Sequence, residues 1–258
     1  MSSARGAVLA FAGLATVALG SQAVLAKESA VVVDEALKRD LLTLRGAQLF
    51  FGHQSVGRNI LDGVAALARE AGIELTLGEG SIGENQQPGS KFEAWARRAE
   101  QGGTEQLFAM KLCYVDIQQE TDGAAVLADY QRAVARVRQA RPGIKVLHIT
   151  TPLTTPGTGL KNWLKRTLGR SLWEDQVNAR RQAYNRALRE AFPGEPIFDL
   201  AAAESTRPDG SREEHVVDGV PVPMLWPGYA SDEGHLNEEG QRVAARAFIA
   251  ALAQALRQ

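Results

Sequence analysis

Residues 47–72 read AQLFFGHQSVGRNILDGVAALAREAG, and this stretch decides the fold. The apolar run at 47–51 predicts a buried strand, and 56–72 carries apolar residues at helical spacing and ends in a glycine. A short turn with a glycine, a histidine and a serine joins the two. A strand that passes directly into a helix is the building unit of α/β proteins.

The same alternation runs through the rest of the chain. Further strands are predicted at 73–77, 105–117, 145–150 and 196–200, and further helices at 33–44, 124–140, 174–192 and 238–256. Short apolar strands that alternate with helices favour a mostly parallel sheet covered on both faces. Ligands of such sheets bind beyond the carboxyl ends of the strands, so functional residues are expected in the loops that follow strands.

Two segments interrupt the alternation. Residues 205–229 carry Pro-Asp-Gly and Asp-Gly around an alternating run, which predicts a β-hairpin. Residues 150–173 contain Pro and Gly turns and a short basic amphipathic helix that includes Trp163. This helix is interpreted either as a solvated lid or as a lid that presents positive charge and the Trp163 ring to an acidic or sugar-like substrate.

The composition and the N-terminus bear on compartment and partners. The chain has 258 residues and a formal net charge of -1, which gives no global electrostatic signal for nucleic acid. Residues 1–26 have a basic start, an apolar stretch and small residues before Lys27, which predicts a secretory signal peptide and a mature domain at 27–258. We therefore expect a periplasmic or secreted protein with no stable membrane span after processing; an uncleaved anchor is the alternative.

Neither a nucleotide nor a metal site is expected. Gly78, Gly80 and Gly83 spell G-x-G-x-x-G, but they lie in a stretch predicted as a polar loop, residues 78–91, where a dinucleotide fingerprint would open a helix. The four histidines show no metal-ligand spacing, and the single cysteine, Cys113, lies in an apolar run typical of a buried, inert thiol. The sequence therefore predicts no cofactor.

A catalytic pair is predicted from two distant loops. Asp232 and His235 stand three apart just before the last helix, where Asn237 is an expected N-cap. A carboxylate so placed can bind one imidazole nitrogen and leave the other as a general base for a serine hydroxyl. Ser55 follows the first strand, so it belongs to the same end of the sheet. The alternative is that Ser55 only caps the helix at 56–72.

These motifs resemble those of the SGNH (GDSL-type) hydrolases, a superfamily of esterases and lipases with a flavodoxin-like three-layer fold. The resemblance spans residues 48–258, and SDEGHLNEEGQ (231–241) is its most specific element. It implies Ser55 as nucleophile, His235 as base and Asp232 as the orienting carboxylate. It also implies an oxyanion hole from the Ser55 N–H, a glycine N–H, with Gly83 preferred over Gly80, and an Asn side chain.

The chain departs from that family at two places. GHQS puts Gln54 before the serine where the family has Asp, and CYVD (113–116) puts Val115 where the family has its oxyanion-hole Asn. Loss of one donor typically costs ~10²–10³ in turnover, and Asn85 is the expected replacement. An exported esterase acting on an acylated carbohydrate or small ester is predicted; the alternatives are a non-catalytic domain that binds glycan or assists its modification, and a flavodoxin-like exported small-molecule binding protein. His53 is interpreted either as a substrate contact or as a local hydrogen-bond partner.

Overall fold

The computed structural model describes residues 32–157, 159, 162, 164, 167–168 and 172–258. The predicted signal peptide and Trp163 lie outside these residues, as do the four basic residues of the predicted lid, Lys161, Lys165, Arg166 and Arg170.

A five-stranded parallel sheet forms the centre of the molecule. Its strands are β1 (Leu49–His53), β2 (Glu79–Ser81), β3 (Leu107–Met110), β4 (Lys145–Ile149) and β5 (Ile197–Phe198), in the order β2-β1-β3-β4-β5. This is the order of flavodoxin-like sheets. The predicted fold class, an α/β sandwich of three layers, is confirmed.

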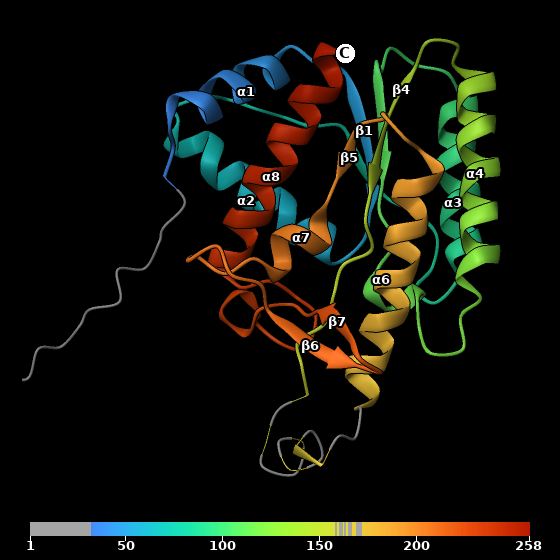
Figure 1. Ribbon diagram of the computed structural model, residues 1–258. Helices are drawn as coiled ribbons and strands as arrows, with labels where there is room; N and C mark the ends of the chain where they lie inside the picture. Colours follow the sequence, from blue (N-terminus) through green and yellow to red (C-terminus); the bar gives the residue numbers. More distant parts are fainter. Residues whose placement is uncertain (1–31, 158, 160–161, 163, 165–166, 169–171) are drawn as a thin grey trace, which may run out of the picture.

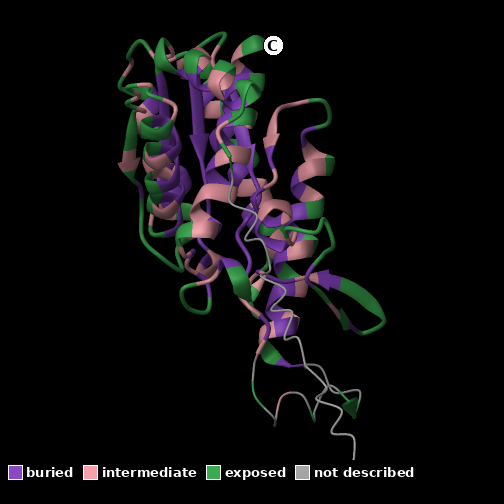
Figure 2. Ribbon diagram, turned by 90° about the vertical axis from the view of Figure 1, so that its left-hand side faces the viewer, coloured by how far each residue is buried: buried purple, intermediate pink, exposed green. Residues whose placement is uncertain are grey.

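Helices cover both faces of the sheet (Figure 1). One face carries α1 (Glu35–Arg45), α2 (Val56–Glu70) and α8 (Glu238–Arg257); the other carries α3 (Pro88–Glu100), α4 (Gly123–Ala140) and α6 (Trp173–Ala191). Successive strand residues point to opposite faces, so Phe51 of the fully buried β1 enters the core under α2 and α8 while Phe50 enters the core under α3 and α4. Figure 2 shows the buried strands between these two helical layers. No helix in the described ranges is long and apolar enough to cross a membrane.

The second strand and the helix after it differ from the sequence prediction. The strand lies at Glu79–Ser81 and not at 73–77, because pairing with β1 begins only where Gly78 accepts a hydrogen bond from the Phe51 N–H. The prediction of a polar loop up to residue 91 is also wrong in its last part. Helix α3 begins at Pro88, where the missing N–H of proline has no intrahelical partner to lose.

The predicted hairpin is confirmed. Strands β6 (Glu214–Val217) and β7 (Val220–Pro223) pair antiparallel across the two-residue turn Asp218-Gly219, and both turn residues have positive φ, 49° and 81°. Positive φ at both turn residues suits the right-handed twist of a hairpin. The hairpin lies at the end of the molecule where the chain passes from β1 into α2 (Figure 1).

Candidate active site

Ser55 lies where the chain leaves β1 and enters α2. It is exposed, its backbone is neither helical nor extended (φ 13°, ψ −85°), and its side chain makes no capping hydrogen bond to α2. Among the described residues its hydroxyl has no hydrogen-bond partner at all. The interpretation of Ser55 as a side-chain cap therefore does not fit the structure, and the hydroxyl is available for chemistry.

The turn around Ser55 is tight because Gly57 lies against the ring of His53. A Cβ at Gly57 would come within 2.3 Å of His53 Cβ, closer than real Cβ contacts allow. Helix α2 can therefore start directly over the end of β1 only with glycine at this position.

His53 lies beneath this turn and not in an open pocket. It is 3% exposed, and its Nε2 donates to Glu79 Oε2 at 2.9 Å, while Arg58 binds the other oxygen of Glu79 at 2.9 Å. Burial lowers the pKa of His53 despite the opposing effect of Glu79, so the imidazole is neutral at pH 7. The predicted substrate contact is thus corrected: His53 is a local hydrogen-bond partner that ties β1 to β2.

Asp232 and His235 form the expected pair in the loop before α8. His235 Nδ1 lies 2.7 Å from Asp232 Oδ2, and Asp232 Oδ1 accepts the N–H groups of Gly234 at 2.9 Å and His235 at 2.8 Å. Burial raises the pKa of Asp232, but these three hydrogen bonds outweigh it and hold the pKa below the ordinary value. The ionised carboxylate therefore keeps the proton on Nδ1 and leaves Nε2 as the basic nitrogen.

The start of α8 fixes the same loop from the other side. Asn237 Oδ1 accepts the Gly240 N–H at 3.0 Å, which confirms the predicted N-cap. The Tyr114 ring stands edge-on to His235, with ring centroids 5.7 Å apart, and Gly234 leaves room for it. His235 is therefore held on two sides, by Asp232 and by an aromatic wall.

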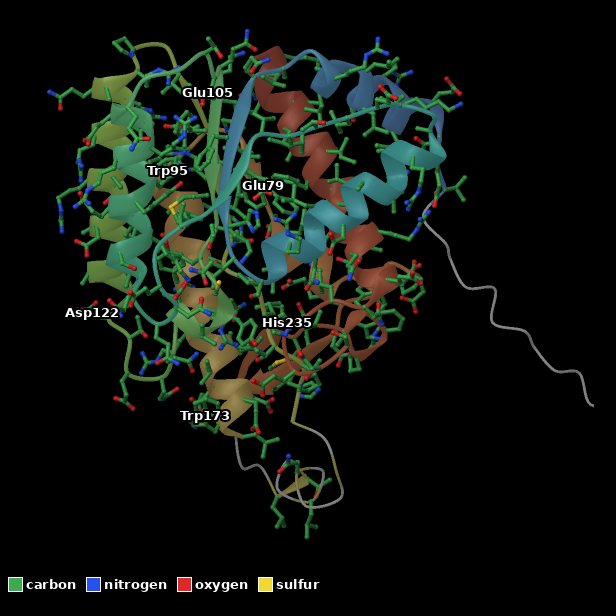
Figure 3. All side chains as sticks on the ribbon, turned by 180° about the vertical axis from the view of Figure 1, so that it is seen from behind. Glu79, Trp95, Glu105, Asp122, Trp173 and His235 are labelled. Atoms are coloured by element: carbon green, nitrogen blue, oxygen red, sulfur yellow. The ribbon has the colours of Figure 1, made fainter. Side chains whose placement is uncertain are left out.

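The structure brings the first and last loops together. Asn59, one helical turn beyond Ser55, accepts the N–H of Leu236, the residue after His235, at 3.2 Å. Figure 3 shows His235 at the end of the sheet where α2 starts. Ser55 Oγ and His235 Nε2 are not hydrogen-bonded to each other, and within the described part of the chain neither has another partner. Catalytic hydrogen bonds in ligand-free sites are often loose and tighten with substrate.

The loop after β2 is tied to the residue before Ser55. The Gln54 amide donates to the carbonyls of Ile82, at 3.0 Å, and Gly83. Gly83 has φ 55°, and a Cβ there would lie 2.5 Å from the backbone nitrogen of Lys91, so only glycine fits. The N–H groups of Ser55 and Gly83 take part in no hydrogen bond with any described residue. Gln54, a departure from the family pattern, thus joins the two turns.

Asn85 belongs to the turn that follows. Its Oδ1 accepts from Lys91 Nζ at 3.1 Å, and Lys91 in turn binds Asp116 Oδ2 at 2.5 Å. Asp116 also accepts the N–H groups of Gln86 at 2.8 Å and Cys113 at 2.6 Å. The turn at 84–87 is thereby fixed against the short 3-10 helix η1 (Tyr114–Asp116). The sequence gives no signal for Lys91, because a fully buried lysine interrupts the apolar pattern of α3 and the pattern of this segment predicts a polar loop.

A second group of buried charges holds the loops after β3 and β4. Arg181 Nε donates to the carbonyls of Tyr114 at 3.0 Å and Ile117 at 3.2 Å. Glu204 accepts the Leu153 N–H at 2.7 Å, and burial raises its pKa to about 8. These contacts fix the backbone of η1, which carries Tyr114, and the loop after β4.

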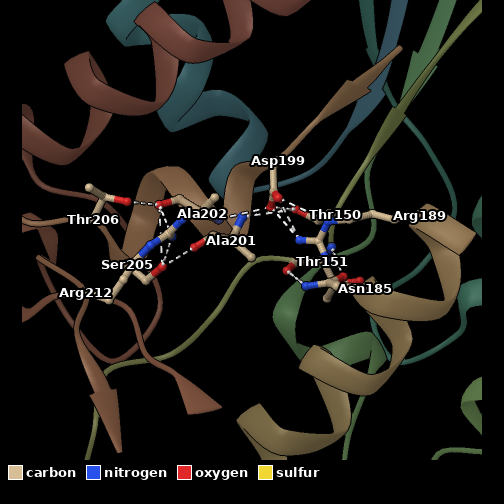
Figure 4. A network of polar contacts seen from close by, with 10 residues as sticks. All are labelled: Thr150, Thr151, Asn185, Arg189, Asp199, Ala201, Ala202, Ser205, Thr206 and Arg212. Carbon is tan, nitrogen blue, oxygen red and sulfur yellow. Dashed lines mark hydrogen bonds and ion pairs between the residues drawn. The ribbon is translucent and has the colours of Figure 1, made fainter. Parts of the chain in front are cut away.

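The loops after β4 and β5 are joined by a separate polar network (Figure 4). Asp199 binds Arg189 at 2.7 Å and accepts from Thr150 Oγ1 at 3.2 Å, while it caps α7 (Leu200–Ser205) through the Ala202 N–H. Asn185 exchanges two hydrogen bonds with the backbone of Thr151, at 2.7 and 2.9 Å. Within the described residues, no group of three or more His, Cys, Asp or Glu side chains could hold a metal ion.

No protein-family model matches the chain, and no curated protein matches its sequence. Its fold is similar to solved structures. A carbohydrate acetylesterase family member from Sinorhizobium meliloti has 14% identity and a TM-score of 0.48, and covers 82% of this chain and 100% of its own. A lipase/acylhydrolase from Enterococcus faecalis has 12% identity and a TM-score of 0.48, over 81% and 96% of the two chains. An inhibitor-bound aryl esterase from M. smegmatis has 13% identity and a TM-score of 0.47, over 81% and 100%. Similarity at this level concerns the fold, and the chemistry has to be argued from the residues of this chain.

Proposed function

We propose that this protein is an exported serine ester hydrolase that removes acyl groups from a polysaccharide or cell-envelope glycan. One observation supports the proposal: the Asp232–His235 pair leaves Nε2 without a partner among the described residues, and the Asn59–Leu236 hydrogen bond joins the loop of His235 to the first turn of α2, which follows the Ser55 hydroxyl. A serine hydroxyl needs such a base to become a nucleophile.

The proposed mechanism uses these groups in turn. His235 Nε2 takes the proton of Ser55 as Oγ attacks the ester carbonyl, and Asp232 stabilises the imidazolium that forms. The N–H groups of Ser55 and Gly83 and the Asn85 amide bind the oxyanion. His235 returns the proton to the departing alcohol, and water then hydrolyses the acyl-enzyme with His235 again as the base.

The substrate class rests on access to the site. The side chains of Asp232 and His235 keep 54% and 34% of their surface exposed, so the base lies in an open site and not in a deep acyl tunnel. An open site suits an acyl group on a large polymer. Export and a periplasmic or secreted location follow from the predicted signal peptide at 1–26.

A non-catalytic glycan-binding domain is the second candidate. The observation that favours it is Val115, an apolar side chain in the place of the family's oxyanion-hole Asn. Such a domain would keep the fold and the open site without turnover.

The test uses purified mature protein, a p-nitrophenyl acetate panel and a fluorophosphonate probe. We expect Ser55→Ala to abolish labelling and to lower kcat by several orders of magnitude in a folded protein, and His235→Ala to be nearly as damaging, because members of one catalytic unit are non-additive. Ser211→Ala is the matched control, since Ser211 is exposed and its hydroxyl bonds, among the described residues, only to Asp209 in the same turn. Wild type that neither hydrolyses an ester nor accepts the probe would establish the binding-domain alternative.

A further inference from the structure

Lys91 is a fully buried lysine that lies under the exposed turn at 84–87. It lies on the first turns of α3, its side chain is 0% exposed, and its ammonium bonds to Asp116 Oδ2 and Asn85 Oδ1. Burying a lysine is costly unless it is paired and hydrogen-bonded. A methionine would fill the same space without that cost, so the charge needs a reason beyond packing.

The contact fixes which way the Asn85 amide faces. An ammonium group donates three hydrogen bonds and accepts none. At 3.1 Å from Lys91 Nζ, the Asn85 side chain must therefore present its oxygen. The two donors of its Nδ2 consequently point away from Lys91, and among the described residues they meet no acceptor.

Lys91 also connects Asn85 to η1, the 3-10 helix that contains Val115. Lys91 bonds both to Asn85 and to Asp116, the neighbour of Val115. The ammonium group therefore links the Asn85 amide to η1. Val115 stands where the resemblance implies an oxyanion-hole Asn, and Asp116 is the next residue of η1. The turn at 84–87 is thus bonded to η1, and Asn85, an exposed side chain, is the amide that this turn holds next to the 3-10 helix that carries Val115.

The charge of Lys91 also suits this task. Asp116 balances it, and the Cys113 and Gln86 N–H groups satisfy the carboxylate, so the pair adds no net charge under the site. A cation on the amide oxygen draws electron density from Nδ2 and strengthens its donors, as hydrogen bonds in a chain polarise one another. We propose that Lys91 is a positioning residue that orients and polarises the Asn85 amide as the side-chain donor of the oxyanion hole, an inference that rests on the proposed function.

The experiment is a double-mutant cycle of Asn85→Ala and Lys91→Met, with kcat and KM measured separately. We expect Asn85→Ala to lower kcat by ~10²–10³ with KM changed less than about threefold, as for loss of one oxyanion donor. Lys91→Met should lower kcat at least about tenfold, with the same pH midpoint for kcat as wild type, since His235 is untouched. In the Asn85→Ala background, Lys91→Met should have less than about a threefold further effect, because its partner is gone.

Two further variants keep the result interpretable. Lys91→Met leaves Asp116 unpaired, so Lys91→Met/Asp116→Asn removes both charges and should show the same loss of kcat in a folded protein. Lys111→Met is the matched control: Lys111 is 1% exposed, and its ammonium hydrogen-bonds, among the described residues, only to the Leu112 carbonyl and Cys113 Sγ, so its kcat should stay within about threefold of wild type.

The outcomes separate the inference from the function on which it rests. Activity that survives Ser55→Ala overturns the proposed function. If Ser55→Ala is inactive but folded Lys91→Met/Asp116→Asn keeps the kcat of wild type, Lys91 has no positioning role and the serine mechanism stands. Fully additive losses in the cycle would also overturn the inference, because they would mean that Lys91 acts by a route other than Asn85.

Discussion

Glu204 makes the stability of this protein depend on pH. Its carboxyl is 2% exposed, and its Oε1 meets no partner among the described residues. Burial raises its pKa from 4.5 to about 8. The unfolded chain therefore releases this proton near pH 4.5, while the folded protein keeps it up to about pH 8. Each rise in pH between these values lowers the free energy of unfolding, so the contribution of this group to stability falls as pH rises.

The magnitude follows from the two pKa values. A full proton of difference changes the free energy of unfolding by about 1.4 kcal/mol per pH unit. Between pH 5 and pH 8 the slope is full in the middle and weaker at each end, which gives about 3 to 4 kcal/mol in total. No reduction for solvent screening applies, because the carboxyl is buried.

The Glu204→Gln variant isolates this effect. Glutamine keeps an acceptor for the Leu153 N–H but does not titrate, so the free energy of unfolding of the variant, relative to wild type, should rise by about 3 to 4 kcal/mol from pH 5 to pH 8. Urea unfolding of both proteins at each pH unit measures it. A difference that stays constant within about 0.5 kcal/mol over this range would refute the reasoning, since a titration of this size cannot be hidden by a fixed offset.

Two further predictions concern the site. Asp232→Asn keeps an acceptor for the Gly234 and His235 N–H groups but turns an amide donor toward Nδ1, so we expect kcat to fall ~10²–10⁴-fold. Ester hydrolysis measures this fall, with Asp209→Asn in a similar turn as the control. An unchanged kcat would contradict the role of Asp232. Gly57→Ala should destabilise the fold by about 1 to 3 kcal/mol in urea unfolding, because the new Cβ meets His53 at 2.3 Å; Gly89→Ala, with open space around it, should not, and equal effects at both positions would argue against the clash.

Local patterns in the sequence predicted much of what the structure contains. The change from an apolar run to helical spacing in residues 47–72 correctly predicted β1 and α2, because β1 is buried on both faces and α2 on one. Asp218-Gly219 predicted the hairpin turn, since both residues must adopt positive φ there. The spacing of Asp232 and His235 predicted their hydrogen bond, because three residues of a compact turn bring a carboxylate and an imidazole together.

Other features depend on partners far away in the chain. The pattern of 73–77 predicted a strand, but an edge strand exists only where its neighbour pairs with it, and β1 pairs with 79–81. The sequence allows His53 to be either a substrate contact or a local hydrogen-bond partner. The packing of Gly57 against its ring and the hydrogen bond to Glu79 decide for the second role.

The sequence by itself determined most of the order of strands and helices, the hairpin turn and the residue types expected in an ester hydrolase, because these depend on neighbours along the chain; helix α3 and the position of β2 are the exceptions. Only the tertiary structure decided which loops meet. Lys91 illustrates the difference: from the sequence it is a charge in a polar stretch, and in the fold it is a buried cation between Asn85 and Asp116. The physical reason is that burial and pairing of a charge are set by segments 6 and 25 residues away along the chain, which local periodicity does not contain.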